Sequence, residues 1–97
     1  MKEKVYACLS SVPPGKVTTY GQIALHLGNR HLARAVGNIL HHNPDPTRIP
    51  CHRVVNSRGE VAVHYAFGGA AAQRKRLESE GIVFSPNGTV DLKKYGI

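Results

Sequence analysis

Acidic residues, cysteines and long apolar stretches are all scarce in this sequence. No apolar run approaches the roughly 20 residues that a membrane-spanning helix requires. Glu3 lies close to the N-terminus and no long apolar segment follows it, which argues against a signal peptide. Two cysteines, Cys8 and Cys51, are too few for a disulfide framework. We therefore expect free thiols, a reducing compartment and a cytoplasmic protein.

The shortage of acids leaves a strong positive charge. Thirteen Lys and Arg against six Asp and Glu give a formal charge of +7 in 97 residues. Such a surplus predicts a polyanionic partner, nucleic acid before a membrane, although composition alone leaves open a basic protein with no such partner. The length predicts one domain, residues 1–97, with a modest core. The histidines lack a matched ligand spacing, so no metal site is predicted.

Apolar residues recur at helical spacing in three parts of the chain, and a fourth helix is predicted without such a stripe. Thr19 and Gln22 have the form of a capping box at the start of the second of these parts. Gly81 provides the stop signal for the last one. The predicted helices cover residues 2–11, a short stretch from Thr19 to Gly28-Asn29, residues 31–41, and about 70–80.

The second and third predicted helices are joined by a short turn that contains glycine, which is typical of a helix-turn-helix. Helical hairpins without any role on DNA have the same pattern, so this alternative stays open. The polar face of the third helix has no acid, which favours a surface for nucleic acid. Its polar residues are Arg30, His31, Arg34, Asn38 and His41.

A short hairpin or turn, and a second hairpin in the tail, are predicted in the rest of the chain. Val54-Val55 and residues 61–63 flank a turn-forming stretch at 56–59. In the tail, apolar residues on both sides of Pro86-Asn87-Gly88 predict a terminal hairpin. We therefore expect an α/β domain that is mainly helical, with small β-hairpins.

A cysteine lies beside a histidine in the stretch Pro50-Cys51-His52-Arg53-Val54-Val55. A thiol becomes a good nucleophile when a neighbouring group takes its proton. On spacing alone this dipeptide is weak evidence, because adjacent side chains on a strand point to opposite faces. The segments around it give it weight.

Together these segments resemble the C-terminal DNA-binding domain of the O6-alkylguanine-DNA alkyltransferases and their alkyltransferase-like relatives. The resemblance covers most of the chain, from about Val5 to Gly81, and implies a winged helix-turn-helix-like fold. Four motifs carry it in the family's order: Thr19-Tyr20-Gly21-Gln22, Ala33-Arg34-Ala35-Val36-Gly37, Asn43-Pro44 and Ile49-Pro50-Cys51-His52-Arg53-Val54-Val55.

The resemblance implies a catalytic role for four residues. Cys51 matches the acceptor that attacks the carbon on guanine O6. His52 matches the base that takes the thiol proton through a water, and Glu80 matches the acid that orients this base. Tyr20 matches the phenol that protonates the leaving guanine. The residues alone leave Tyr20 open as a packing residue and Glu80 as a surface acid, and no cofactor is implied.

The resemblance also implies how DNA is bound. Arg34 matches the side chain that fills the gap left by a flipped nucleotide, unless it is only part of a solvated face. Asn43 matches a hinge between the recognition helix and the acceptor segment. The helix of residues 31–41 would enter the minor groove, where Ala33 and Gly37 allow close approach. Asn38 and Arg53 complete the expected DNA-binding set. The expected substrate pocket consists of Tyr65, Phe67, Gly68 and Gly69.

Two departures from the family keep alternatives open. The family's enzymes usually carry an N-terminal domain that this chain lacks, and its stand-alone members often have Trp at the cysteine position. The loop Tyr65-Ala66-Phe67-Gly68-Gly69 also lacks the hydroxyl that usually follows the tyrosine. The leading hypothesis is a monomeric, single-turnover alkyltransferase acting on double-stranded DNA, away from membranes. The alternatives are a non-enzymatic lesion sensor that recruits nucleotide excision repair, and a transcription regulator, which would leave Cys51-His52 unexplained.

Overall fold

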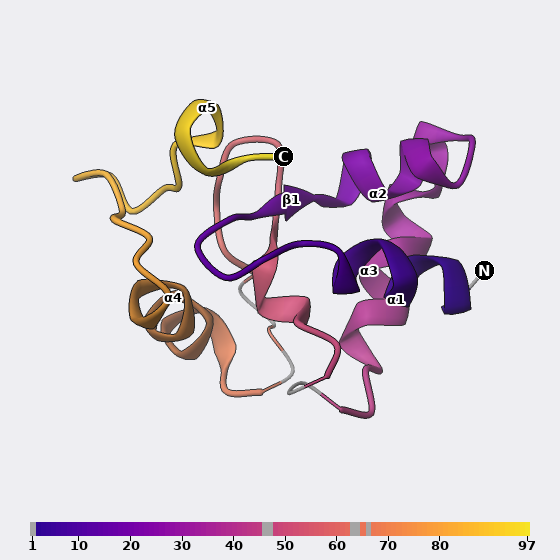
Figure 1. Cartoon of the computed structure of the whole chain (residues 1–97), viewed down its shortest axis with the longest axis horizontal. Coiled ribbons are helices and arrows are strands. Elements are labelled where there is room, and N and C mark those ends of the chain that lie inside the picture. Colours follow the sequence, from indigo (N-terminus) through magenta and orange to yellow (C-terminus); the bar gives the residue numbers. More distant parts are fainter. Residues whose placement is uncertain (1, 46–47, 63–64, 66) are drawn as a thin grey trace.

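The structure is a computed structural model that describes residues 2–45, 48–62, 65 and 67–97. Figure 1 shows α1, α2 and α3 at one end of the molecule and α4 and α5 at the other, with the stretch that follows α3 running between them. The elements are α1 (Lys2–Ser10), β1 (Thr18–Thr19), α2 (Tyr20–His26), the 3-10 helix η1 (Arg30–Leu32), α3 (Ala33–His41), the 3-10 helix η2 (Cys51–Arg53), β2 (Val54–Val55), α4 (Gly69–Ser79) and α5 (Leu92–Tyr95).

The predicted helix-turn-helix is formed by α2, η1 and α3. Thr19 caps α2, because its hydroxyl accepts a hydrogen bond from the Gln22 amide at 3.1 Å. Asn29 caps η1 in the same way, accepting from the His31 amide at 2.9 Å. Gly28, with a φ of 96°, makes the turn between them. The predicted mainly helical fold is confirmed, and the helix expected from residue 31 begins with a 3-10 turn.

A first hydrophobic core lies between α1, α2 and α3. The residues that predicted these helices line it, and Cys8 packs at its edge, partly exposed. Both cysteines are free thiols, as expected. The buried members of this core are Val5, Leu9, Val12, Ile23, Ala24, Val36, Leu40, Cys51, Val54 and Tyr65.

A second core lies between α4 and the tail. The parallel strands β1 and β2 separate it from the first, with Thr18 opposite Val54 and Thr19 opposite Val55. Side chains alternate along a strand, so Val54 enters the first core while Val55 enters the second. The buried members of this second core are Val17, Val55, Leu77, Ile82, Phe84, Val90 and Tyr95.

Neither stretch expected as a hairpin forms paired strands among the described residues, although the first forms the turn that the sequence also allowed. Residues 56–59 do turn, with the Gly59 amide donating to the Asn56 carbonyl at 2.9 Å, but β2 pairs with β1 instead of with the stretch that follows the turn. Val63 in that stretch lies outside the described residues. In the tail, Asp91 accepts from the Lys93 amide and starts α5. The tail's apolar residues fill the second core, so no strand ladder is needed to bury them.

No helix among the described residues is both long enough and apolar enough to cross a membrane.

Candidate active site and DNA-binding surface

Helix α4 directs one face toward the segment that begins at Cys51. Gln73 and Arg76 lie three residues apart on this helix, and Glu80 follows four residues later as its C-cap. Side chains at these spacings share a helix face. The helix packs against η2, which brings the three side chains close to the Cys51-His52-Arg53 turn.

Glu80 holds two neighbouring side chains of that turn. Its carboxylate accepts a hydrogen bond from His52 Nε2 at 2.9 Å and two from the Arg53 guanidinium, at 3.0 and 2.6 Å. Burial alone would raise the pKa of Glu80, but these bonds from Arg53 and His52 outweigh it and lower the pKa. Glu80 is therefore ionised at neutral pH, and the expected pairing of this acid with His52 is present.

The hydrogen bond to Glu80 fixes the tautomer of His52. Because Nε2 donates to a carboxylate, the neutral ring carries its lone pair on Nδ1. Nδ1 is fully buried and has no hydrogen-bond partner in the described part of the chain. Burial lowers the pKa of His52 despite the opposing effect of Glu80. The ring is neutral at pH 7 and can accept a proton at Nδ1.

The thiol of Cys51 is buried beside several polar groups. Only 7% of the residue is exposed. Burial raises the pKa of this thiol, and Asn43, Arg76 and Tyr65 partly offset the rise. At neutral pH the thiol therefore keeps its proton, so a reaction at sulfur requires a base.

Tyr20 begins α2 and lies close to both α3 and Cys51. A Cβ built on Gly37 would lie 3.8 Å from the Tyr20 ring, so the ring packs on the recognition helix at this glycine. Burial, and secondly the neighbouring Cys51, raise the pKa of the phenol. Tyr20 thus stays protonated and can act as a donor. It also lines a groove of about 350 Å³ with Asn56, Glu60, Val61 and Ala62.

Asn43 connects the end of α3 with the Cys51 segment. It is 5% exposed, and its amide donates to the Ile49 carbonyl at 2.7 Å while its oxygen accepts from the Asp45 amide at 2.9 Å. Asn43 also lowers the pKa of the Cys51 thiol, against the effect of burial. The expected hinge position is therefore occupied by a residue that ties the two segments together.

The polar face of α3 is open to solvent. Arg34, Asn38 and His41 are exposed and share one side of the helix, while Val36 and Leu40 on the other side are buried. Ala33 and Gly37, next to Arg34, are partly buried and leave the backbone accessible. This surface carries positive charge and no acid, which suits a phosphate backbone.

The sequence matches a known family over most of its length. Residues 1–82 match the family model described as the DNA-binding domain of 6-O-methylguanine DNA methyltransferase. This chain belongs to that family. It is 37% identical over 95 residues to the DNA base-flipping protein of Escherichia coli strain K12, covering 96% of this chain and 70% of the relative. It is 40% identical over 96 residues to the mouse methylated-DNA–protein-cysteine methyltransferase, covering 99% of this chain but 44% of that enzyme.

A solved structure of another family member has the same fold. The Schizosaccharomyces pombe protein Atl1, solved in complex with damaged DNA containing O6-carboxymethylguanine, aligns with a TM-score of 0.83 and 38% identity. The alignment covers 97% of this chain and 91% of that one. The helix-turn-helix-like architecture is thus the architecture of the alkyltransferase family's DNA-binding domain.

Arg53, which the sequence suggested as a DNA contact, is held inside the alkyltransferase-family fold. Its side chain is 14% exposed, and its guanidinium binds Glu80 on one side and donates to the Val12 carbonyl at 2.9 Å on the other. Because these bonds occupy it, we assign Arg53 a structural role. Its position directly after Cys51-His52 gave no sign of this in the sequence.

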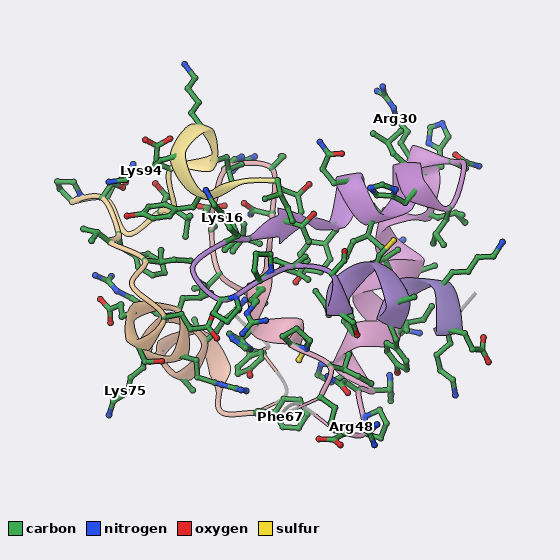
Figure 2. All side chains as sticks on the ribbon, in the orientation of Figure 1. Lys16, Arg30, Arg48, Phe67, Lys75 and Lys94 are labelled. Carbon is green, nitrogen blue, oxygen red and sulfur yellow. The ribbon has the colours of Figure 1, made fainter. Side chains whose placement is uncertain are left out.

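The residues expected to form the family's substrate pocket start α4. Tyr65 is buried, whereas Phe67 is 37% exposed, and their rings meet edge to face with centroids 5.7 Å apart. Figure 2 shows Phe67 at the same end of the molecule as Arg48. Gly68 and Gly69 both have positive φ, and the Gly69 amide donates to the Tyr65 carbonyl at 2.8 Å. Ala66 lies outside the described residues.

Two residues of α4 that sequence reasoning missed complete the site. Gln73 is 1% exposed and donates to the carbonyls of His52 and Val54, both at 2.9 Å, while accepting from the Ala62 amide at 2.8 Å. Arg76 donates to the Tyr65 hydroxyl at 2.9 Å. Their spacing from Glu80, seven and four residues, was the signal that would have found them.

No three His, Cys, Asp or Glu side chains in the described ranges lie close enough together to hold a metal ion.

Proposed function

We propose that this protein extrudes an O6-alkylated guanine from duplex DNA and transfers the alkyl group irreversibly to Cys51. One observation carries the proposal: the residue directly after the buried Cys51 thiol is a histidine whose ring is oriented by a carboxylate through one nitrogen and is unpaired at the other. A structural histidine would normally have both buried nitrogens satisfied. An unpaired Nδ1 next to a nucleophile is instead suited to taking a proton.

The proton transfers follow from the three pKa shifts. Cys51 has a raised pKa and needs a base, and His52 has a lowered pKa and is neutral. Glu80 stays ionised, so it stabilises the imidazolium formed when His52 takes the thiol proton. The sulfur then attacks the alkyl carbon, the carbon–O6 bond breaks, and Tyr20 donates a proton to the departing guanine. The thioether has no route back, so each molecule reacts once.

DNA binding is assigned to α3. We propose that this helix enters the minor groove, with the exposed Arg34 in the stack where the flipped base was. Extrusion costs a few kcal/mol, and a side chain that occupies the gap offsets part of it. Tyr20 and the groove that it lines would receive the guanine, since Tyr20 packs on α3 at Gly37 and is influenced by Cys51. Asn38 and the backbone at Ala33 and Gly37 would contact the DNA.

A lesion sensor is the second candidate, and the comparisons favour it at one point. The chain covers 91% of S. pombe Atl1, which was solved on damaged DNA, but 44% of the mouse methyltransferase. In this version Cys51 is not alkylated, and the bound lesion is passed to nucleotide excision repair. The expected monomeric state and cytoplasmic location apply to both candidates and stay predictions.

The deciding experiment combines intact mass spectrometry with a binding assay. The protein is incubated with a duplex containing one O6-methylguanine, and an undamaged duplex of the same sequence is the control. Transfer predicts a gain of one methyl group that is absent in Cys51→Ala. Preferential binding to the damaged duplex without a mass gain identifies the sensor. Equal affinity for the two duplexes, with no mass gain, contradicts both candidates.

Two variants test the assigned roles separately. Arg34→Ala is expected to weaken binding to damaged duplex at fixed salt, and His41→Ala on the same exposed face is the matched control for lost polar surface. Tyr20→Phe keeps the ring against Gly37 and removes the donor, so it is expected to slow transfer more than it weakens binding. Unchanged lesion affinity in Arg34→Ala would contradict the assignment of base extrusion to this residue.

A further inference from the structure

The proposed chemistry leaves one charged residue of the site without a role. Arg76 lies on α4 between Gln73 and Glu80, and both of these neighbours are occupied by the Cys51 segment. On the same helix face, Arg76 reaches the hydroxyl of the buried Tyr65 at 2.9 Å. Its guanidinium is therefore directed into the site instead of into solvent.

Arg76 differs from the other arginines of this half of the molecule because no carboxylate neutralises it. Arg53 pairs with Glu80, Arg74 with Glu78, and Arg58 lies 4.0 Å from Glu60. Among the residues that the structure describes, Arg76 forms no ion pair, and its side-chain hydrogen bond goes to the neutral phenol of Tyr65. A half-buried cation without a counter-charge is unfavourable, so a bound anion would be stabilised there.

The charge acts at the reacting atom. The guanidinium is one of the groups that offset burial in the pKa of the Cys51 thiol, after Asn43, and it also lowers the pKa of His52. Tyr65, which Arg76 holds, also lowers the pKa of the same thiol. A cation that influences both Cys51 and His52 also influences any charge placed against the sulfur.

The direction of attack puts the alkyl group on the α4 side. The guanine must lie toward Tyr20, which belongs to α2, because this phenol protonates it. Figure 1 shows α2 and α4 on opposite sides of the stretch that follows α3. In an in-line displacement the sulfur and O6 lie on opposite sides of the attacked carbon, so the sulfur is on the side away from Tyr20. The rest of the O6 substituent then lies beside the sulfur, whose pKa is influenced by both Arg76 and Tyr65.

We infer that Arg76 makes this site selective for O6-alkylguanines whose substituent carries a negative charge, of which the carboxymethyl group is the simplest. The inference rests on the proposed function and adds the substrate class. A carboxylate one bond beyond the attacked carbon lies within reach of the guanidinium, whose five N–H donors suit carboxylate geometry. In the transfer, a bond forms between sulfur and the methylene carbon while the bond from this carbon to O6 breaks. The thiol proton goes to His52, Tyr20 protonates the guanine, and the carboxylate keeps its charge.

The test compares two substituents of nearly equal size and different charge. Duplexes of one sequence carry O6-carboxymethylguanine, its neutral carbamoylmethyl analogue, O6-methylguanine or plain guanine. Affinity by fluorescence anisotropy at fixed salt, and the initial transfer rate by intact mass spectrometry, give a ratio of carboxymethyl over carbamoylmethyl. We expect a ratio of about ten or more in the wild type, as a hydrogen-bonded charge pair supplies.

The variants assign the preference to one charge. Arg76→Met is expected to reduce the ratio to about one, and Arg76→Lys to retain part of it, because the charge stays while the fork of donors is lost. Lys75→Met removes the same charge from the next position on α4, and Figure 2 shows Lys75 at the outer edge of the molecule. It should keep the wild-type ratio. Tyr65→Phe removes the hydroxyl that Arg76 binds and leaves the charge of Arg76 in place, so it should also keep most of the ratio.

The outcomes separate this inference from the proposed function. A wild-type ratio near one, or equal losses in Arg76→Met and Lys75→Met, overturns the selectivity while leaving lesion recognition intact. If no damaged duplex is bound or repaired better than plain guanine, both fail together. The wild-type ratio decides the matter even if Arg76→Met does not fold.

Discussion

The two hydrophobic cores differ in how they are built. The first consists of three helices whose buried residues recur at regular spacing, and it supports the exposed face of α3. The second consists of one residue of α4, one residue just before β1, one residue of β2, and the tail that includes α5. Under the proposed function the first presents α3 to DNA, whereas α4 of the second carries Gln73 and Glu80, which hold the Cys51-His52-Arg53 turn. Recognition and chemistry therefore depend on different parts of the chain.

The site lies where these two cores meet. Cys51 and Val54 belong to the first core, Val55 to the second, and Gln73 of α4 binds the main chain between them. Damage to the second core should therefore disturb chemistry before it disturbs DNA binding. The four predictions that follow test this difference.

The largest effect is expected for Glu80→Ala. It leaves the mostly buried Arg53 without its carboxylate and His52 without its acceptor. Removing one partner of a buried ion pair typically costs about 3–5 kcal/mol, measured here as the free energy of unfolding in urea. The exposed Arg58–Glu60 pair provides the control. Glu60→Ala should lower the free energy of unfolding by well under 1 kcal/mol. Equal costs for the two changes would mean that the Glu80 network does not stabilise the fold.

Truncating one leucine in each core compares the two directly. Leu9→Ala and Leu77→Ala each remove a fully buried side chain, so each should cost about 2–5 kcal/mol in unfolding free energy. Under conditions where both variants are folded, only Leu77→Ala is expected to slow alkyl transfer, because α4 carries Gln73 and Glu80. Circular dichroism establishes folding, and intact mass spectrometry gives the rate. A larger rate loss in Leu9→Ala would reverse the assignment.

A smaller effect is expected for Gln73→Leu, which keeps the volume and removes three hydrogen bonds. The carbonyls of His52 and Val54 and the Ala62 amide lose their partner, which should lower the free energy of unfolding by about 1–3 kcal/mol. Transfer should slow while affinity for damaged duplex is retained. Gln22→Leu, at an exposed position of α2, is the matched control. Loss of affinity instead of rate would place Gln73 with the recognition surface.

The smallest effect is a dependence of stability on pH. The folded-state pKa values of Glu80 and His52 both lie below their ordinary values of 4.5 and 6.5. The unfolded chain therefore binds more protons, and the stability from both groups is present above those values and lost on acidification. Urea unfolding between pH 8 and pH 4 should show a decline that begins near pH 6.5 for His52 and steepens below pH 4.5 for Glu80. Glu80→Gln should flatten the lower part, and an unchanged profile would contradict this.

The first core could be predicted from the sequence, and much of the second could not. Helical periodicity and the Thr19 cap are local signals, so α1, α2 and α3 were expected close to where they lie. The pairing of β2 with β1 is a contact between distant segments, and the two-residue strands have no pattern of their own. Asp91 caps α5 in a tail whose apolar residues also fitted a hairpin.

The candidate site, like the fold, could be predicted from the sequence only in part. The resemblance to a known family supplied Cys51, His52, Glu80 and Tyr20, but it did not supply Gln73 or Arg76, or the ion pair of Arg53 with Glu80. Those three positions depend on which way α4 faces, and its polar composition leaves that rotation undetermined by sequence. Only Gln73 and Leu77 are buried on this helix.

The short parallel ladder has a consequence for the spacing of the reacting groups. Thr18 pairs with Val54, the phenol follows Thr18 by two residues, and the sulfur precedes Val54 by three. The phenol of Tyr20 and the sulfur of Cys51 thus both take their positions from the Thr18–Val54 pair. If the pairing of β1 with β2 slipped by one residue, the phenol and the sulfur would move apart, and Val54 and Val55 would exchange faces. The proposed chemistry therefore requires this register.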